Sequence, residues 1–74
     1  MDITNMKTGE RGIIKSILGG YGLTKRLSAM GIREGVEITK VSAQWMGGPV
    51  VIRIGNTQVA IGYGMAKKII VEKI

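Results

Sequence analysis

The side chains that most often carry catalysis are almost missing from this chain. Its 74 residues include no cysteine and no histidine, so the usual bases and nucleophiles of triad chemistry and the Cys/His ligands of zinc sites are absent. The carboxylates are scattered, which favours neither a paired-carboxylate site nor a carboxylate metal cage: Asp2, Glu10, Glu34, Glu37 and Glu72. We therefore expect no enzyme, no metal site and no cofactor.

Two glycine-rich segments invite comparison with phosphate-binding loops. Residues 19–25 precede a helix-like stretch, and Gly62 and Gly64 recur later in the chain. Neither segment fits GxxxxGK[ST], and neither fits GxGxxG, since Lys25 and Lys67 stand where that pattern requires glycine. Turns and close backbone packing explain these glycines better than nucleotide binding does.

Basic residues outnumber acidic ones along the whole chain. Lys and Arg total 11 and the formal net charge is +6, which favours nucleic acid, an anionic membrane or an acidic protein face as partner. The adjacent basic pairs are only Lys25-Arg26 and Lys67-Lys68, so a solvated surface with a basic excess also explains the composition. Charge alone does not choose among these partners.

No segment indicates export or membrane insertion. The longest charge-free runs, 41–52 and 54–66, contain glycines and fall short of the roughly 20 apolar residues needed to span a bilayer. The first five residues lack the basic and apolar stretches of a signal peptide. With no cysteine, these features favour a cytoplasmic protein, and a peripheral place at the inner face of the plasma membrane stays open.

Short segments bounded by glycine predict a mainly β fold. Five segments are rich in β-branched or alternating apolar residues and are expected to be strands: 12–18, 36–43, 50–54, 57–63 and 69–74. The apolar phase changes near Thr39-Lys40, which indicates a bulge or sharp bend, and Gly55-Asn56 suits a two-residue hairpin turn. Because closure leaves few bare edges, we expect a single domain over residues 1–74, a small SH3-like barrel of about five strands.

One or two short helices should be inserted in this barrel. Leu23, Leu27 and Met30 recur at i, i+4 and i+7 and form one apolar stripe, which predicts a helix over 23–30, after the first strand. Gly31 is placed to end this helix in a left-handed conformation, with Ile32 lying over Leu27. Residues 64–68 are expected to add a single helical turn.

A loop at residues 45–49 holds the single tryptophan. Trp45, Met46 and Pro49 could give a partner an adaptable apolar contact, since tryptophan supplies large area and methionine fits irregular surfaces. Trp45 could instead cap one end of a barrel that has no phenylalanine to do so.

Three cations on and just after the expected helix form the other candidate contact. Lys25, Arg26 and Arg33 could pair with an acidic protein surface or with phosphate, or they could serve helix solubility. With the apolar stripe facing inward, Lys25 should face solvent, and Arg26 is expected to be half buried along its stem. Nucleic acid ranks second as a partner, because the three aromatic residues are scattered and no RNP-like aromatic string occurs.

Taken in order, these features resemble the FeoA family, small cytoplasmic proteins of the prokaryotic ferrous iron transport system. The pattern basic–Arg–Leu–x–x–Met–Gly–hydrophobic–x–x–Gly occupies residues 25–35, Gly47-Gly48-Pro49 follows, and the opening at 6–12 also fits. Six positions of the pattern are treated as structural: Leu27, Met30, Gly31, Gly35, Gly47 and Gly48.

The resemblance implies an SH3-like barrel and an accessory role. Such a protein would dock on the cytosolic GTPase region of a FeoB-type iron transporter and modulate it, with Trp45, Met46, Pro49, Lys25, Arg26 and Arg33 as the contact residues. The chain also resembles the barrel domain of iron-dependent repressors, so a metal-responsive regulatory module stays an alternative beside a nucleic-acid-binding barrel. Glu10, Glu34, Glu37 and Gln44 offer oxygen ligands, but their spacing specifies no metal site. A homo-oligomer also stays open.

Overall fold

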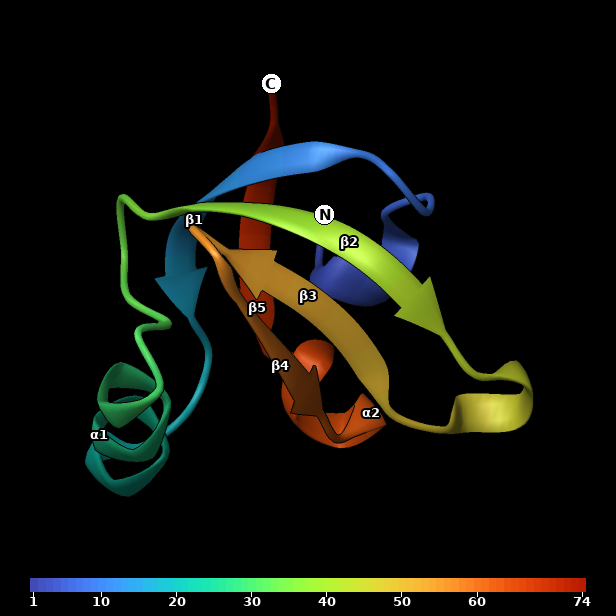
Figure 1. Ribbon diagram of the computed structural model, residues 1–74. Helices are drawn as coiled ribbons and strands as arrows, with labels where there is room; N and C mark the ends of the chain where they lie inside the picture. Colours follow the sequence, from blue (N-terminus) through green and yellow to red (C-terminus); the bar gives the residue numbers. More distant parts are fainter.

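Five antiparallel strands form one sheet in this protein, whose computed structural model describes residues 1–74 apart from the side chain of Trp45. The sheet has the order β4-β3-β2-β1-β5, so the first and last strands are neighbours (Figure 1). The elements follow along the chain as η1 (Ile3–Asn5), β1 (Arg11–Ile17), α1 (Tyr21–Ala29), β2 (Glu37–Ala43), η2 (Trp45–Gly47), β3 (Val50–Ile54), β4 (Thr57–Ile61), α2 (Tyr63–Ala66) and β5 (Ile69–Lys73).

The strands and helices that the sequence predicts are all present, with shifted ends. The main helix follows β1 as expected, although it begins at Tyr21 and ends at Ala29. The alternation that suggested a strand through Tyr63 stops at Ile61, and Tyr63 opens α2 with its side chain 41% exposed. Local periodicity therefore predicts the elements, while their ends depend on where the chain must turn.

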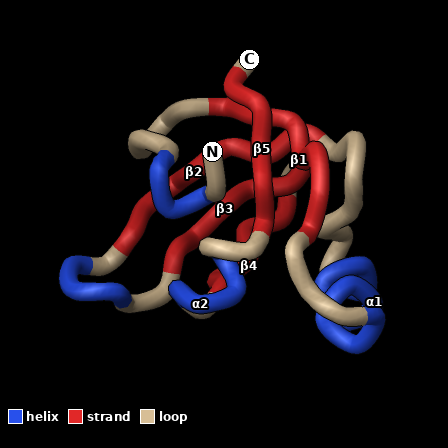
Figure 2. Tube along the Cα trace, turned by 180° about the vertical axis from the view of Figure 1, so that it is seen from behind, coloured by secondary structure: helices blue, strands red, loops and turns tan.

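Two breaks in strand register bend the sheet. One lies between Ile14 and Ser16 where β1 pairs with β5, and the other lies between Lys40 and Ser42 where β2 pairs with β3. The sequence predicted the second break near Thr39-Lys40. In the structure, the pairing with β3 is regular up to Lys40 and the break follows directly after it. Bulges of this kind increase local twist, which lets a single small sheet wrap around a core (Figure 2).

The end of α1 has the geometry that the sequence indicates. Gly31 has φ of +84°, its N–H donates to the Ser28 carbonyl at 3.0 Å, and the Ile32 N–H donates to the Leu27 carbonyl at 2.9 Å. These two bonds define a Schellman ending, which brings the buried side chains of Leu27 and Ile32 together. Directly after the helix, the chain therefore places Ile32 in the core.

The core draws on every strand and on both helices. Its buried apolar residues are Ile3, Met6, Ile14, Leu27, Ile32, Ile38, Val50, Ile52, Ile61, Ala66, Ile69 and Val71. Leu23 and Met30 are half-buried and pack against this cluster, as the apolar stripe of the helix predicts. The position of α1 is therefore set by apolar burial on one side only, which leaves its other side for contacts.

The N-terminal segment was not predicted to be structured, yet it is part of the fold. Ile3 and Met6 are buried in the core, and the Val71 N–H donates to the Met1 carbonyl at 2.7 Å. Lys40, only 5% exposed, donates from Nζ to the carbonyl oxygens of Thr4 at 3.2 Å and Met6 at 2.6 Å. This segment therefore lies along β5, and the hydrogen bonds of the Lys40 side chain hold it to β2.

Candidate interaction site

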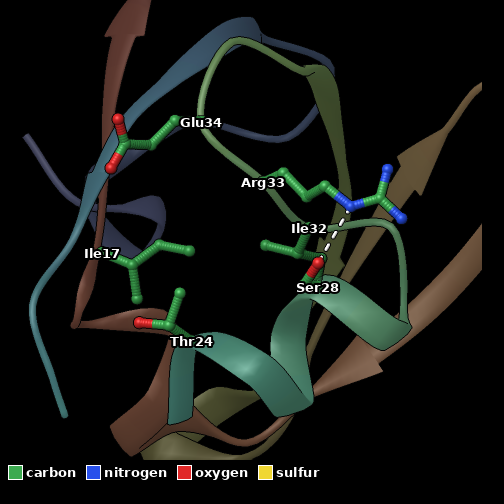
Figure 3. A pocket seen from close by; sticks show the side chains of 6 residues that line it. All are labelled: Ile17, Thr24, Ser28, Ile32, Arg33 and Glu34. Carbon is green, nitrogen blue, oxygen red and sulfur yellow. Dashed lines mark hydrogen bonds between the residues drawn. The ribbon is translucent and has the colours of Figure 1, made fainter. Parts of the chain in front are cut away.

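A pocket of about 330 Å³ opens between α1 and the end of β1 (Figure 3). Its walls combine two isoleucines with polar side chains: Ile17, Thr24, Ser28, Ile32, Arg33 and Glu34. Figure 3 shows Thr24 and Ser28 rising from the helix, with Ile17 and Ile32 on either side of the opening. An apolar pocket with a polar rim can accept an aliphatic side chain that carries a polar neighbour.

Arg33 is held at the rim of this pocket by the helix. Its Nε donates to the Ser28 Oγ at 2.9 Å, which restrains the guanidinium, and within the described residues neither terminal nitrogen has a hydrogen-bond partner. The guanidinium and the carboxylate of Glu34 point in opposite directions in Figure 3, and no ion pair forms between them. A guanidinium oriented in this way is suited to a bidentate contact with a carboxylate.

Lys25 lies on the same side of α1 as Arg33. It is exposed, as the sequence predicts, and its Nζ lies 5.9 Å from the centroid of the exposed Tyr21 ring. Lys25 is three residues before Ser28, and residues at this spacing are neighbours on a helix surface. The structure thus brings two of the three predicted cations, Lys25 and Arg33, to one flank of the helix.

Arg26 lies on the other flank of α1. With about 3.6 residues per turn, it projects away from the side that bears Thr24 and Ser28. The sequence suggested a half-buried stem for Arg26, and in the structure the residue as a whole is exposed.

The loop at η2 lies at the opposite side of the molecule from α1, in both Figure 1 and Figure 2. Met46 is 92% exposed and has φ of 62° and ψ of 41°, a left-handed conformation that non-glycine residues rarely adopt. Pro49 is exposed as well, whereas the side chain of Trp45 lies outside the described part of the structure. The two predicted contact groups, loop and cations, therefore do not form one continuous surface.

Gly48 shapes the loop through close packing. A Cβ at this position would stand 2.6 Å from the Cβ of Gln44, so only glycine lets the two ends of the loop approach. Gly47 has φ of +78°, and a Cβ at this position would stand 3.9 Å from the ring of Tyr63. The chain therefore presents Met46 outward from a closed turn.

Among the residues that the structure describes, ion pairs are confined to the sheet formed by β1, β2 and β5. Three join its strands and the turn before β1: Arg11–Glu37 at 3.3 Å, Lys15–Glu72 at 3.6 Å and Lys73–Glu10 at 2.8 Å. The pKa of Glu10 is lowered, first by the Lys7 N–H that donates to its carboxylate and then by the Lys73 ammonium. The same hydrogen bond to Glu10 raises the pKa of Lys73.

The part of the molecule formed by α1, α2 and the residues that follow each of them, here called the helical end, carries cations without such partners. In the part of the chain that the structure describes, no ion pair is formed by Lys25, Arg26, Arg33, Lys67 or Lys68. Lys67 instead places its Nζ 5.8 Å from the centroid of the Tyr63 ring. A surface with unpaired cations is suited to an acidic partner.

The described residues contain neither a cluster of metal ligands nor a membrane-spanning helix. No group of three His, Cys, Asp or Glu side chains there could hold a metal ion. None of the helices in that part of the chain has the length and apolar character to cross a bilayer.

Sequence reasoning missed the pocket itself. Thr24 and Ser28 have the i, i+4 spacing that places them on one helix flank, which was a usable signal. Their meeting with Ile17 across the β1–α1 connection depends on tertiary packing, which no local pattern contains.

Comparisons with known proteins agree with the resemblance drawn from the motifs. The family model described as the FeoA domain matches residues 1–73. A protein of Methanocaldococcus jannaschii, provisionally named Fe(2+) transport protein A, is 42% identical over 66 residues, which are 89% of this chain and 78% of that protein. These matches cover almost every element of the fold.

Solved structures show the same architecture. An iron uptake regulatory protein (FeoA) matches with a TM-score of 0.90 and 32% identity over 100% of this chain and 96% of its own. Iron(II) transport protein A from Clostridium thermocellum gives 0.92 and 30%, over 100% and 46%. A zinc-complexed FeoA from Stenotrophomonas maltophilia, described as a prokaryotic SH3 domain protein, gives 0.81 and 21%, over 97% and 89%.

A more distant structure shows the fold alone. A manganese-dependent transcriptional repressor matches with a TM-score of 0.90 at 16% identity, over 100% of this chain and 41% of the repressor. The expected SH3-like fold, mainly β with a helix after the first strand, is therefore confirmed. By its family-model match and by its 42% identity to a relative, the chain belongs to the FeoA family, whose members are associated with ferrous iron transport.

Proposed function

We propose that this protein is an accessory protein of ferrous iron uptake that docks on the cytosolic part of a FeoB-type membrane GTPase transporter and modulates it. The family and the Fe(2+) transport name of the archaeal relative support a role in iron transport. The FeoA of Stenotrophomonas maltophilia is described as a suggested activating factor of ferrous iron transport. In this proposal the protein acts by binding and performs no chemistry.

The observation that carries the docking proposal is the apolar pocket with Arg33 at its rim. Ile17 and Ile32 offer a site for one aliphatic side chain of the transporter, and the terminal nitrogens of Arg33 can bind an adjacent carboxylate. Lys25 extends the positive surface along the same flank, and Arg26 reaches only the edge of such a contact. An acidic, partly aliphatic segment of the transporter fits this flank.

The η2 loop is proposed as a second, separate contact. Met46 and Pro49 are exposed and face away from α1, so a partner reaches them and the pocket together only by wrapping across the sheet. Trp45 belongs to this contact by its place in the chain. The adaptable side chain of Met46 suits an apolar patch on the partner.

The test is calorimetric titration of the cytosolic GTPase portion of the transporter with this protein, in GDP and in a GTP analogue. Charge reversal at the pocket, Lys25→Glu with Arg33→Glu, should weaken binding by at least about tenfold, because it places like charges across the contact. Arg26→Glu should cost less, and its matched control is Lys7→Glu, a single reversal at an exposed position on the ion-paired side. Trp45→Ala and Met46→Ala test the loop. Full affinity in all folded variants would contradict the proposal.

Nucleic acid is the second candidate, favoured by the five unpaired cations of the helical end. Binding to generic RNA or DNA would fall steeply with added salt, because each phosphate contact releases counterions. Strong, salt-dependent binding of this kind, together with no binding to the transporter fragment, would favour a nucleic-acid-binding barrel. Heat release on titration with ferrous or manganous ions would instead favour a metal-responsive module.

A further inference from the structure

The two edges of the sheet are treated differently by the chain. The outer edge of β5 is covered by the N-terminal segment, through the Asp2–Ile70 bridge and the hydrogen bond from the Val71 N–H to the Met1 carbonyl. In the described part of the chain the outer edge of β4 has no such cover, since β4 is the last strand of the sheet and pairs only with β3. One edge is therefore closed within the molecule and the other is open.

The backbone groups that point outward from β4 can be identified from its register. The two-residue turn between β3 and β4 closes on the hydrogen-bonded pair Ile54–Thr57, and such pairs alternate with pairs that bond outward. Ile52–Val59 is thus bonded inward, while the N–H and C=O groups of Gln58 and Ala60 face away from β3. Within the described chain, neither of these residues has a backbone hydrogen bond to another segment.

This edge lacks the features that usually prevent pairing. Natural edge strands are protected by charged side chains, proline, bulges or a covering segment. β4 has the sequence Thr-Gln-Val-Ala-Ile and is the one strand without a charged residue. Its register with β3 is unbroken over five pairs, and Thr57, Gln58 and Ala60 are exposed.

We propose that β4 is a pairing site for a second copy of this chain, which adds its own β4 in antiparallel orientation. The outward groups of Gln58 then bond to those of Ala60 in the second copy, and the reverse, with Val59 facing Val59 on the two-fold axis. The second copy fits because the strand is uncharged: self-pairing sets no like charges opposite one another and brings two β-branched side chains together. The resulting sheet runs continuously through both molecules.

Charge makes this association distinct from docking on an acidic partner. Each copy carries a net charge of +6, so the two copies repel one another at long range and added salt should strengthen their pairing. Contacts between Arg33 or Lys25 and acidic groups should weaken in salt instead. The salt dependence therefore separates a failure of this proposal from a failure of the docking proposal.

The test combines analytical ultracentrifugation over a concentration series into the millimolar range with amide hydrogen exchange by NMR. The expected result is a weak dimer, in which the amides of Gln58 and Ala60 gain protection as concentration rises. The double variant Gln58→Lys with Ala60→Lys sets introduced lysines opposite each other and should raise the dimer dissociation constant by about tenfold. Gln58→Lys with Ala60→Glu sets opposite charges face to face and should restore pairing.

A matched control separates local register from general charge. Thr8→Lys with Ala29→Lys adds the same net charge at exposed positions away from β4 and should leave dimerisation close to that of the unmodified protein. Ala60→Pro removes the outward N–H without touching the ladder to β3 and should abolish the dimer in a protein whose fold NMR shows to be intact. A monomer throughout the series, or a dimer whose Gln58 and Ala60 amides stay unprotected, would overturn the proposal.

Discussion

The sheet of β1, β2 and β5 and the helical end of the molecule use their charges in different ways. On the sheet, Lys and Arg side chains are matched with carboxylates in three ion pairs, and Lys40 is buried against backbone carbonyls. On the helical end, five cations face solvent without a carboxylate partner in the described structure. The three ion pairs nearly neutralise the charges of the sheet, whereas the helical end stays strongly basic, so only the sheet has its charges engaged in the fold.

This difference separates charges that serve folding from charges that are available for binding. A side chain that is paired or buried contributes through its partner, and its removal should appear in stability. An exposed, unpaired cation contributes little to stability, and its removal should appear in binding. Substitutions in the two regions should therefore fail in different assays.

The largest loss of stability is expected from Lys40→Met. This change keeps most of the apolar stem but leaves the carbonyls of Thr4 and Met6 without their donor, which should cost about 2 kcal/mol of unfolding free energy. Chemical denaturation measures the loss, and faster amide exchange in residues 1–6 should accompany it. Lys7→Met, at an exposed position nearby, should change stability by less than about 0.5 kcal/mol. Equal effects of the two variants would contradict the role given to Lys40.

The next effect concerns pH and the Glu10–Lys73 pair. Because the pKa of Glu10 is lowered from 4.5, its stabilising contribution is present above that value and is lost as pH falls through the folded-state pKa. Because the pKa of Lys73 is raised from 10.5, its contribution is complete below that value and is lost as pH rises through the folded-state pKa. Glu10→Gln should remove both dependences. Denaturation curves at several pH values that match the unmodified protein at both extremes would refute this assignment.

A smaller effect is expected from the Arg11–Glu37 pair. Both side chains are at least half exposed, at 60% and 50%, so solvent screens the pair and its loss in Arg11→Gln should cost less than about 0.5 kcal/mol. Addition of salt should shrink this difference further. A double-mutant cycle with Glu37→Gln measures the coupling energy of the pair. A coupling energy as large as the effect of Lys40→Met would contradict the claim that exposed ion pairs contribute less to stability than the buried Lys40.

The smallest effect on stability is expected on the helical end. Lys25→Gln with Arg33→Gln removes two unpaired cations and one hydrogen bond to Ser28, so the unfolding free energy should stay within about 0.5 kcal/mol. The thermal unfolding midpoint checks this. A large drop would show that these cations stabilise the fold. It would contradict the view that they are available mainly for binding.

The sequence predicts the fold well because its signals are local. The spacing of Leu23, Leu27 and Met30 marks the helix, Gly31 marks its end, and Gly55-Asn56 marks the hairpin turn. Each of these features depends on neighbours within one turn of helix or one hairpin, and each needs little help from distant parts of the chain.

The features that escaped prediction depend on segments far apart in the sequence. Lys40 shares the inner face of β2 with Ile38, and its burial makes sense only once Thr4 and Met6 supply acceptors from the N-terminal segment. The pocket likewise needs Ile17 beside the helix. The segment that matches the family motif contains Lys25, Arg26 and Arg33, but the motif carries no information about which of these cations share a flank of the helix.

The most direct measurement is chemical-shift mapping on isotope-labelled protein during titration with the unlabelled cytosolic GTPase portion of a FeoB-type transporter. Shift changes should gather at residues 17–34, around Arg33 and the pocket, with a second set at the η2 loop, and should be weak over β2, β5 and the ion-paired part of β1, residues 11–15. Shift changes confined to those segments, or none at saturating transporter fragment, would contradict docking through the unpaired cations.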